Sequence, residues 1–145
     1  MCWSMAGLIV LAPVGVWLLA WLTFQPHRIT RQREATRLIA EFHQRFNEHD
    51  LDAICRDAFT CSELPSLRQD WQALLENTRN RVGIFRGVIR SDIRVYIEPP
   101  GVRANIVSSF EKGELREIFE MKEFEGPLKI VTYQTVTEEK PTSSR

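Results

Sequence analysis

The spacing of hydrophobic positions changes twice along this chain, and the changes divide it into three regions. Residues 5–24 form a run of about 20 residues without a single charged side chain. From residue 31 to residue 82, apolar residues recur at intervals of three and four, which is typical of amphipathic helices. From residue 83 onward, apolar and polar residues alternate, which is typical of half-buried strands. The pattern therefore predicts an apolar helix, a helical region and a sheet, in that order.

The uncharged run has the length that a helix needs to cross a bilayer, whose hydrocarbon core is ~30 Å thick. Trp17 and Trp21 lie towards its C-terminal end, where membrane helices carry an interfacial aromatic belt. A cleaved signal peptide would have a basic start and a small-residue cleavage site, and neither is present in this sequence. We therefore predict an uncleaved anchor over residues 1–25, which contacts the membrane through residues 5–24, in preference to a buried core helix.

Three helices are predicted after a polar joint at residues 25–30, which contains Pro26. The first covers residues 31–48, and Asp50 is placed to cap a short second helix with Leu51 and Ile54 facing inward. Ser66 and Gln69 form a capping-box pattern that opens the third helix, and Gly83 marks its end. The apolar stripe of the first helix consists of Ala35, Leu38, Ile39, Phe42 and Phe46. That of the third consists of Leu67, Trp71, Leu74, Leu75 and Thr78.

Four strands separated by turn residues follow the helices. The first strand runs from Phe85 to Ile97, with a bulge expected near residues 90–92, and the others cover residues 102–110, 115–124 and 128–136. One face of the first strand is predicted to be apolar, through Phe85, Ile89, Ile93, Val95 and Ile97. The fold class is therefore α+β, with three helices packed on a four-stranded antiparallel sheet, preceded by one transmembrane helix. The domain spans residues 30–137, and residues 138–145 form a polar tail.

The charges of the chain balance, with 19 Lys and Arg against 19 Asp and Glu. Nucleic-acid binding draws much of its affinity from a basic excess, so this balance argues against a nucleic-acid partner. The sequence contains no Gly-rich phosphate loop, no nucleophile elbow and no metal-ligand spacing. We therefore expect no cofactor and no metal.

Glu117 is the acidic residue that stands out as a candidate catalytic group. It shares strand parity with Leu115, Phe119 and Met121, and a carboxylate on an apolar face is suited to acid or base chemistry. The alternative is a structural ion pair with an arginine of a neighbouring strand. Other titratable groups are interpreted as solvent-facing; they are His43, His49, Asp70, Glu76 and Asp92.

Arg86, Arg90 and Arg94 share the polar face of the first strand, with Arg103 and Arg116 expected nearby. They are candidates for binding an anionic ligand. The alternative is an outer sheet face on which Glu98, Glu114 and Glu120 balance these charges.

Cys55 and Cys61 are candidates for a disulfide that would close a small loop after the second helix. An oxidising compartment would join the two thiols, and a reducing one would not. Packing alone is the alternative role for both residues.

The order of elements, together with "GIF" after the third helix and the "FEKGELREIFEM" motif, resembles the NTF2-like superfamily. The likeness is strongest to small bacterial domains of the DUF4019 and DUF4878 type, whose function is unknown, and it covers roughly residues 32–136. The last strand departs from the pattern, because it lacks an aromatic residue at its start. The residues that carry the likeness are Trp71, Leu74, Leu75, Gly83, Phe85, Phe110, Gly113, Glu117, Phe119, Met121, Ile130 and Tyr133.

This resemblance implies a sheet that curves around the helices as a cone, often with an apolar pocket in its mouth. It also implies a location outside the cytoplasmic membrane. The basic residues after the apolar run, His27 to Arg37, favour the cytoplasmic side instead. Of the two sides we predict the extracytoplasmic one, where Cys55 and Cys61 would be bridged.

Three functions follow as hypotheses. The first is a non-catalytic module that binds a protein or a small apolar ligand, with a homodimer through the exposed sheet face as a further possibility. The second is a cone-fold enzyme, similar to an isomerase or dehydratase, that acts on a small hydrophobic substrate through Glu117. The third is a structural accessory subunit of an envelope complex. An open apolar cavity with two convergent titratable groups would favour the enzyme, and a filled cone would favour the interaction module.

Overall fold

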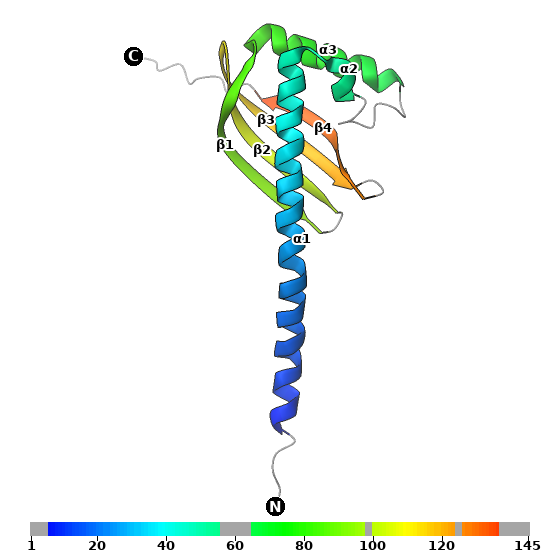
Figure 1. Ribbon diagram of the computed structural model, residues 1–145, viewed down its shortest axis with the longest axis vertical. Helices are drawn as coiled ribbons and strands as arrows, with labels where there is room; N and C mark the ends of the chain where they lie inside the picture. Colours follow the sequence, from blue (N-terminus) through cyan, green and yellow to red (C-terminus); the bar gives the residue numbers. More distant parts are fainter. Residues whose placement is uncertain (1–5, 56–64, 98–99, 124–125, 137–145) are drawn as a thin grey trace, which may run out of the picture.

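The computed structural model describes the backbone of residues 6–55, 65–97, 100–123 and 126–136, and the side chains of these residues except 6–26, 65 and 66. Helices come first and four antiparallel strands follow in the spatial order β1-β2-β3-β4, as an open sheet (Figure 1). This confirms the α+β class and the predicted meander. The elements are α1 (Ala6–Glu48), α2 (Leu51–Ala53), α3 (Pro65–Val82), β1 (Phe85–Tyr96), β2 (Gly101–Phe110), β3 (Gly113–Glu123) and β4 (Leu128–Val136).

Helix α1 is continuous over 43 residues, so the expected joint at residues 25–30 and the separate helix starting at residue 31 are wrong. Pro26 has no amide hydrogen and removes one backbone hydrogen bond, but the bonds of the neighbouring turns carry the helix through. The first half of α1 projects beyond the sheet, and its second half lies across the sheet (Figure 1).

Within the residues whose side chains the structure describes, no helix is long and apolar enough to span a membrane. The side chains of residues 1–26 lie outside that description. The anchor over residues 1–25 therefore stays a prediction, as does the polar tail, because residues 137–145 also lie outside it.

The sheet curves around the second half of α1, and the core lies between them (Figure 1). Ala35, Ile39, Phe42 and Phe46 are all buried, which confirms the predicted apolar stripe of this helix. They pack against inward-facing residues of the strands, and these are Val102, Ala104, Ile106, Phe110, Leu115, Phe119, Met121, Leu128, Ile130 and Tyr133.

Polar contacts fix α1 where it first meets the sheet. Arg31 forms an ion pair with Glu123 of β3 at 2.6 Å and donates to the Gly126 carbonyl oxygen at 3.0 Å. Glu34 accepts a hydrogen bond of 2.9 Å from the Leu128 amide, where β4 begins. Partial burial raises the pKa of Glu34, but the Leu128 amide and the Arg31 guanidinium outweigh it and lower that pKa overall. The turn between β3 and β4 is thereby tied to α1.

The C-terminal end of α1 is held by α3. The Arg79 guanidinium donates to the carbonyl oxygens of Phe46 and Asn47 in the last turn of the helix, and the Phe46 oxygen also accepts from the His49 amide. His49 adopts a left-handed conformation with φ of 62° and ends the helix. Asp50 then caps α2, because its carboxylate accepts a hydrogen bond of 3.0 Å from the Ala53 amide, as predicted.

Helix α3 begins at Pro65, one residue before the predicted cap. Leu75 and Thr78 are buried as expected, but Leu67 is 41% exposed, so its assignment to the apolar stripe is wrong. Leu67 lies in the first turn of the helix. Gly83 ends α3 with φ of +78°, and its amide bonds the Arg79 carbonyl oxygen at 2.8 Å, which confirms the predicted stop.

Strand β1 contains two register shifts against β2, between Phe85 and Gly87 and between Val88 and Arg90. Each shift inserts one extra residue and changes which side chains face inward. Ile89 is the inserted residue of the second bulge and is 53% exposed, so its predicted place on the apolar face is wrong. The bulge was expected one residue or more later, at residues 90–92. Ile97 is also exposed, at 57%, because it follows the last residue of β1.

We predict that a protein lacking residues 1–29 folds as a soluble domain. The hydrogen bonds and ion pairs described above between α1 and the sheet are made by Arg31, Glu34 and residues after them, so the deletion removes none of these. Circular dichroism should show a mixed helix and strand spectrum with a cooperative melt, and size exclusion should give a defined species. Precipitation or a disordered spectrum would show that the deleted segment belongs to the core.

Candidate functional site

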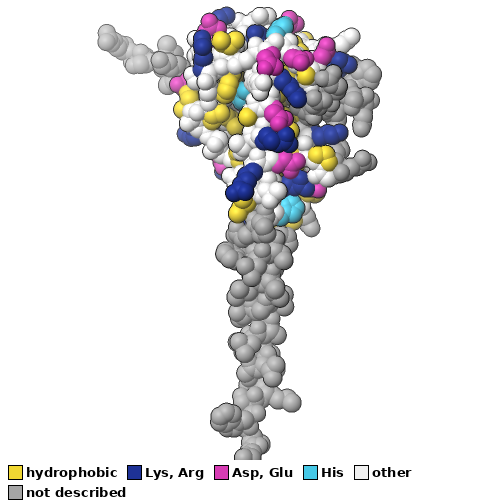
Figure 2. All heavy atoms as spheres, in the orientation of Figure 1, with side chains coloured by type: hydrophobic (Ala, Val, Ile, Leu, Met, Phe, Trp, Pro, Cys, Tyr) yellow, Lys and Arg dark blue, Asp and Glu magenta, His cyan; other side chains and the backbone are white. Residues whose placement is uncertain are grey.

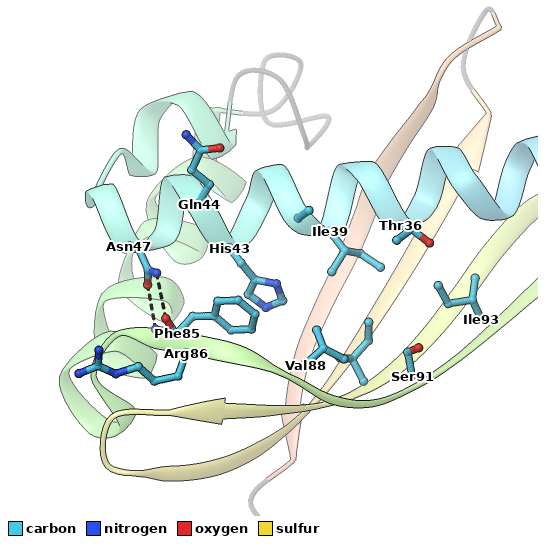
Figure 3. Close-up of a pocket in the computed structure, with 12 residues that line it drawn as sticks. Thr36, Ile39, His43, Gln44, Asn47, Phe85, Arg86, Val88, Ser91 and Ile93 are labelled. Atoms are coloured by element: carbon cyan, nitrogen blue, oxygen red, sulfur yellow. Dashed lines mark hydrogen bonds between the residues drawn. The ribbon is translucent and has the colours of Figure 1, made fainter.

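A cavity of about 660 Å³ opens between α1 and β1. Its described lining comes from α1, β1 and one residue of β2, so it lies on the β1 side of the helix (Figure 3). The bulges of β1 determine which of its residues line the cavity, and these are Phe85, Arg86, Val88, Ser91 and Ile93. From α1 come Thr36, Ile39, Ala40, His43, Gln44 and Asn47. Six of these twelve residues are polar or charged, but the surface that they present to the cavity is mainly apolar.

His43 forms part of this wall and is only 2% exposed. Its imidazole stacks on the Phe85 ring, with 3.9 Å between the ring centroids and 5° between the planes. The side-chain amide of Asn47 donates to the Phe85 carbonyl oxygen at 3.0 Å and accepts from the Phe85 amide at 2.8 Å (Figure 3). Asn47 thus pairs with β1 as a neighbouring strand would, and this fixes the ring that covers His43.

Glu117 lies next to His43, on the strand β3, and its side chain is fully buried. Its Oε2 atom is 2.9 Å from His43 Nε2 and accepts a hydrogen bond of 2.5 Å from the Ser108 hydroxyl. Its Oε1 atom accepts a hydrogen bond of 2.8 Å from the Tyr133 hydroxyl. One carboxylate on β3 therefore connects α1, β2 and β4. A buried charge is costly unless it is hydrogen-bonded, and three donors satisfy this one.

The hydrogen bonds also define the tautomer of His43. Because a carboxylate only accepts, Nε2 carries the hydrogen and donates it to Glu117. In the neutral ring Nδ1 is then the acceptor. Nδ1 is buried and has no hydrogen-bond partner among the described residues. The site thus holds one polar atom whose bonding capacity is unused.

Tyr133 is nearly as buried as Glu117. Burial raises the pKa of its phenol well above the usual value, and the charge of Glu117 and the hydrogen bond to it act in the same direction. The phenol therefore stays protonated and acts as a donor to the carboxylate.

Two of the interpretations drawn from sequence are wrong at this site. Glu117 does face the core, but it pairs with His43, Ser108 and Tyr133 and not with an arginine. His43 is buried and not solvated. The signal for His43 was its spacing, because it lies four residues after Ile39 and three before Phe46 and so belongs to the same helix face. The other expected surface groups are exposed, and these are His49, Asp70, Glu76 and Asp92.

The arginines of the sheet do not all share one face. Arg90, Arg94, Arg103 and Arg116 line one depression on the outer face, where Arg94 bonds Asp92 at 3.0 Å. Arg86 is the extra residue of the first bulge and lines the inner cavity instead, so its predicted grouping with Arg90 and Arg94 is wrong.

Cys55 is buried at the end of the short α2 region. Cys61 lies outside the described residues, so the disulfide between the two stays a prediction.

Comparison of the chain with known protein families, curated proteins and solved structures finds no match. The resemblance to the NTF2-like superfamily therefore stays a prediction that rests on the residues given above.

We predict that Tyr133 makes the stability of the domain fall steeply in alkali. The unfolded phenol loses its proton near pH 10, whereas the native phenol keeps it to a higher pH, so unfolding releases a proton in this range. The free energy of unfolding should therefore fall by up to about 1.4 kcal/mol per pH unit more steeply in the wild type than in Tyr133→Phe.

Urea denaturation between pH 8 and pH 11.5 measures this difference. Tyr96→Phe, which removes an exposed phenol, is the matched control and should keep the wild-type slope. Equal slopes for wild type and Tyr133→Phe would contradict the prediction.

Proposed function

We propose that this protein is a membrane-anchored, NTF2-like domain whose cavity binds a small, mainly apolar molecule without transforming it. The observation that carries the proposal is the cavity between α1 and β1, whose volume of about 660 Å³ is in the range typical of small-molecule sites. Ile39, Phe85, Val88 and Ile93 supply apolar surface, and burying such surface drives the binding of an apolar ligand.

The polar groups of the cavity suggest where a ligand would carry its own polar atom. His43 lies in the wall with its ring fixed by Glu117 and Phe85, and Arg86 also lines the cavity. A ligand with an apolar body and one hydroxyl, carbonyl or acidic group would suit this arrangement. Because the ring is already held in place, little conformational entropy would be lost on binding.

The order of the secondary-structure elements supports the NTF2-like assignment, since the helices precede a four-stranded meander that curves around α1 (Figure 1). The uncharged run of residues 5–24 supports the anchor. This run lies on the same continuous helix as the stripe that packs on the sheet, so the anchor would lead directly into the domain.

An enzyme is the second candidate, and the pairing of His43 with Glu117 favours it. Glu117 itself does not line the cavity and all its oxygen atoms are engaged, so it is not placed to exchange a proton with a ligand. In an enzyme His43 would be the acid or base that contacts the substrate, and Glu117 would hold its tautomer. Turnover of a bound ligand that is lost in His43→Gln would favour this candidate.

Filling the cavity should weaken ligand binding at least ~10-fold. Ala40 is exposed and lines the cavity from α1, so Ala40→Phe places a ring in the space with little effect on the core. Ala73→Phe is the matched control, because Ala73 is exposed on α3 and does not line the cavity.

Fluorescence titration of the domain with anilinonaphthalene sulfonate, an apolar probe with one acidic group, measures the effect. We expect saturable binding at one site in the wild type and in Ala73→Phe, and at least ~10-fold weaker binding in Ala40→Phe, a loss of about 1.4 kcal/mol. Equal affinity in all three proteins, or no saturable binding by the wild type, would contradict the proposal.

A further inference from the structure

Three large hydrophobic side chains are exposed at the end of the domain from which the first half of α1 projects. Ile29 of α1 is 47% exposed, Tyr96 at the end of β1 is 45% exposed and Ile97 is 57% exposed. Ile29 and Tyr96 line the same depression between α1 and β1. Exposed apolar residues that gather in one place mark an interaction surface more often than single ones do.

Basic side chains accompany these residues. Arg28 and Arg94 line the same depression, and Lys122 lies on β3 opposite the start of β2, next to the turn that follows Ile97. All three side chains are exposed. Figure 2 shows hydrophobic, basic, histidine and acidic side chains next to one another at this end of the domain. We call Arg28, Ile29, Arg94, Tyr96, Ile97 and Lys122 the rim.

The distance between the rim and the uncharged run on α1 indicates which surface the rim could contact. The uncharged run ends at Phe24, and Ile29 follows five residues later on the same helix. At ~1.5 Å per residue the two are separated by about 7.5 Å along the helix axis. The headgroup layer on each side of a bilayer is roughly 5–8 Å thick. If Phe24 marks the edge of the hydrocarbon, Ile29 lies at the depth of the lipid headgroups or at their outer edge.

The helix also restricts how the domain can sit. Because α1 is continuous between Phe24 and Arg31, no linker lets the domain turn away from the membrane. Arg31 fixes this helix to the β3–β4 turn through Glu123 and Gly126. The end of the sheet nearest Ile29 is therefore held facing the plane that the anchor would cross.

We propose that the rim rests in the headgroup layer of the membrane. The inference depends on the anchor that the proposed function includes. Tyr side chains favour this layer because one end of the ring is apolar and the other polar. Ile29 and Ile97 would add apolar contact, and Arg28 and Lys122 would meet lipid phosphates, whereas the charge of Arg94 is paired with Asp92. The rim thus orients the domain, with the cavity mouth set at a fixed distance from the bilayer.

Depth-dependent fluorescence quenching tests this arrangement on the full-length protein in phosphatidylcholine vesicles with and without phosphatidylglycerol. Single cysteines are introduced at Ile97, Val136 and Leu19 in a Cys2→Ser, Cys61→Ser background, with the buried Cys55 kept, and each is labelled with bimane. Val136 is the matched control, because it is 42% exposed but lies far from the rim. Strand β4 begins beside the rim at Leu128, which pairs with Glu123, and Val136 lies roughly 26 Å further along the strand. Leu19 reports on the anchor.

We expect lipids with a headgroup nitroxide to quench the label of Ile97→Cys at least threefold more strongly than that of Val136→Cys. Lipids with an acyl-chain nitroxide should quench the label of Leu19→Cys. If Leu19→Cys is quenched and Ile97→Cys is quenched no more than Val136→Cys, the rim does not touch the membrane and this inference alone is wrong. If Leu19→Cys is not quenched, the anchor is wrong and the inference with it.

Discussion

The buried carboxylate of Glu117 is the interaction on which the arrangement of this domain depends. Its three donors come from α1, β2 and β4, while Glu117 itself belongs to β3. An ionised carboxylate in the core is tolerated only where such donors are in place, and removing one partner of a buried pair typically costs 3–5 kcal/mol. Because Glu117 needs donors from α1, β2 and β4, the register of three strands is coupled to the position of the helix. His43 can reach Glu117 only if α1 crosses the sheet at this height, with Phe42 and Phe46 in the core on either side.

The same constraint leaves space on one side of the helix. With α1 tied to β3 through His43 and Glu117, the curved edge strand β1 forms the opposite wall, and the cavity lies between α1 and β1. The two bulges of β1 then decide which side chains line it, since each inserted residue moves the inward set by one position. Asn47 closes one end by pairing with the Phe85 backbone. The ligand site that we propose is thus a consequence of how the helix is fixed.

Periodicity predicted most of the fold, because it reports where apolar side chains are buried. It located β4 at its observed bounds, the apolar stripe of α1 and the stop at Gly83. It failed where one residue breaks the period. Ile89 has the spacing of a core residue, but a bulge turns it outward. Pro26 suggested a boundary, yet one missing hydrogen bond does not end a helix whose neighbouring turns are intact.

The site was only half predictable for a related reason. Strand parity placed Glu117 on the apolar face, but a parity argument says nothing about which groups of other elements meet it. The spacing of His43 from Ile39 and Phe46 indicates that it faces the core, but its partner Glu117 is 74 residues away and no local pattern identifies it. Nothing in the local sequence identified Asn47 as a partner of β1, because that contact depends on where the helix ends relative to the sheet.

A double-mutant cycle between His43 and Glu117 tests the central claim most directly. The free energy of unfolding of the domain would be measured by urea denaturation for the wild type, His43→Gln, Glu117→Gln and the double variant. If this pair fixes the helix to the sheet, the effects are not additive, and we predict a coupling energy of about 1–3 kcal/mol. Effects that add within about 0.5 kcal/mol would contradict the account, because they would show that His43 and Glu117 contribute to stability independently of each other.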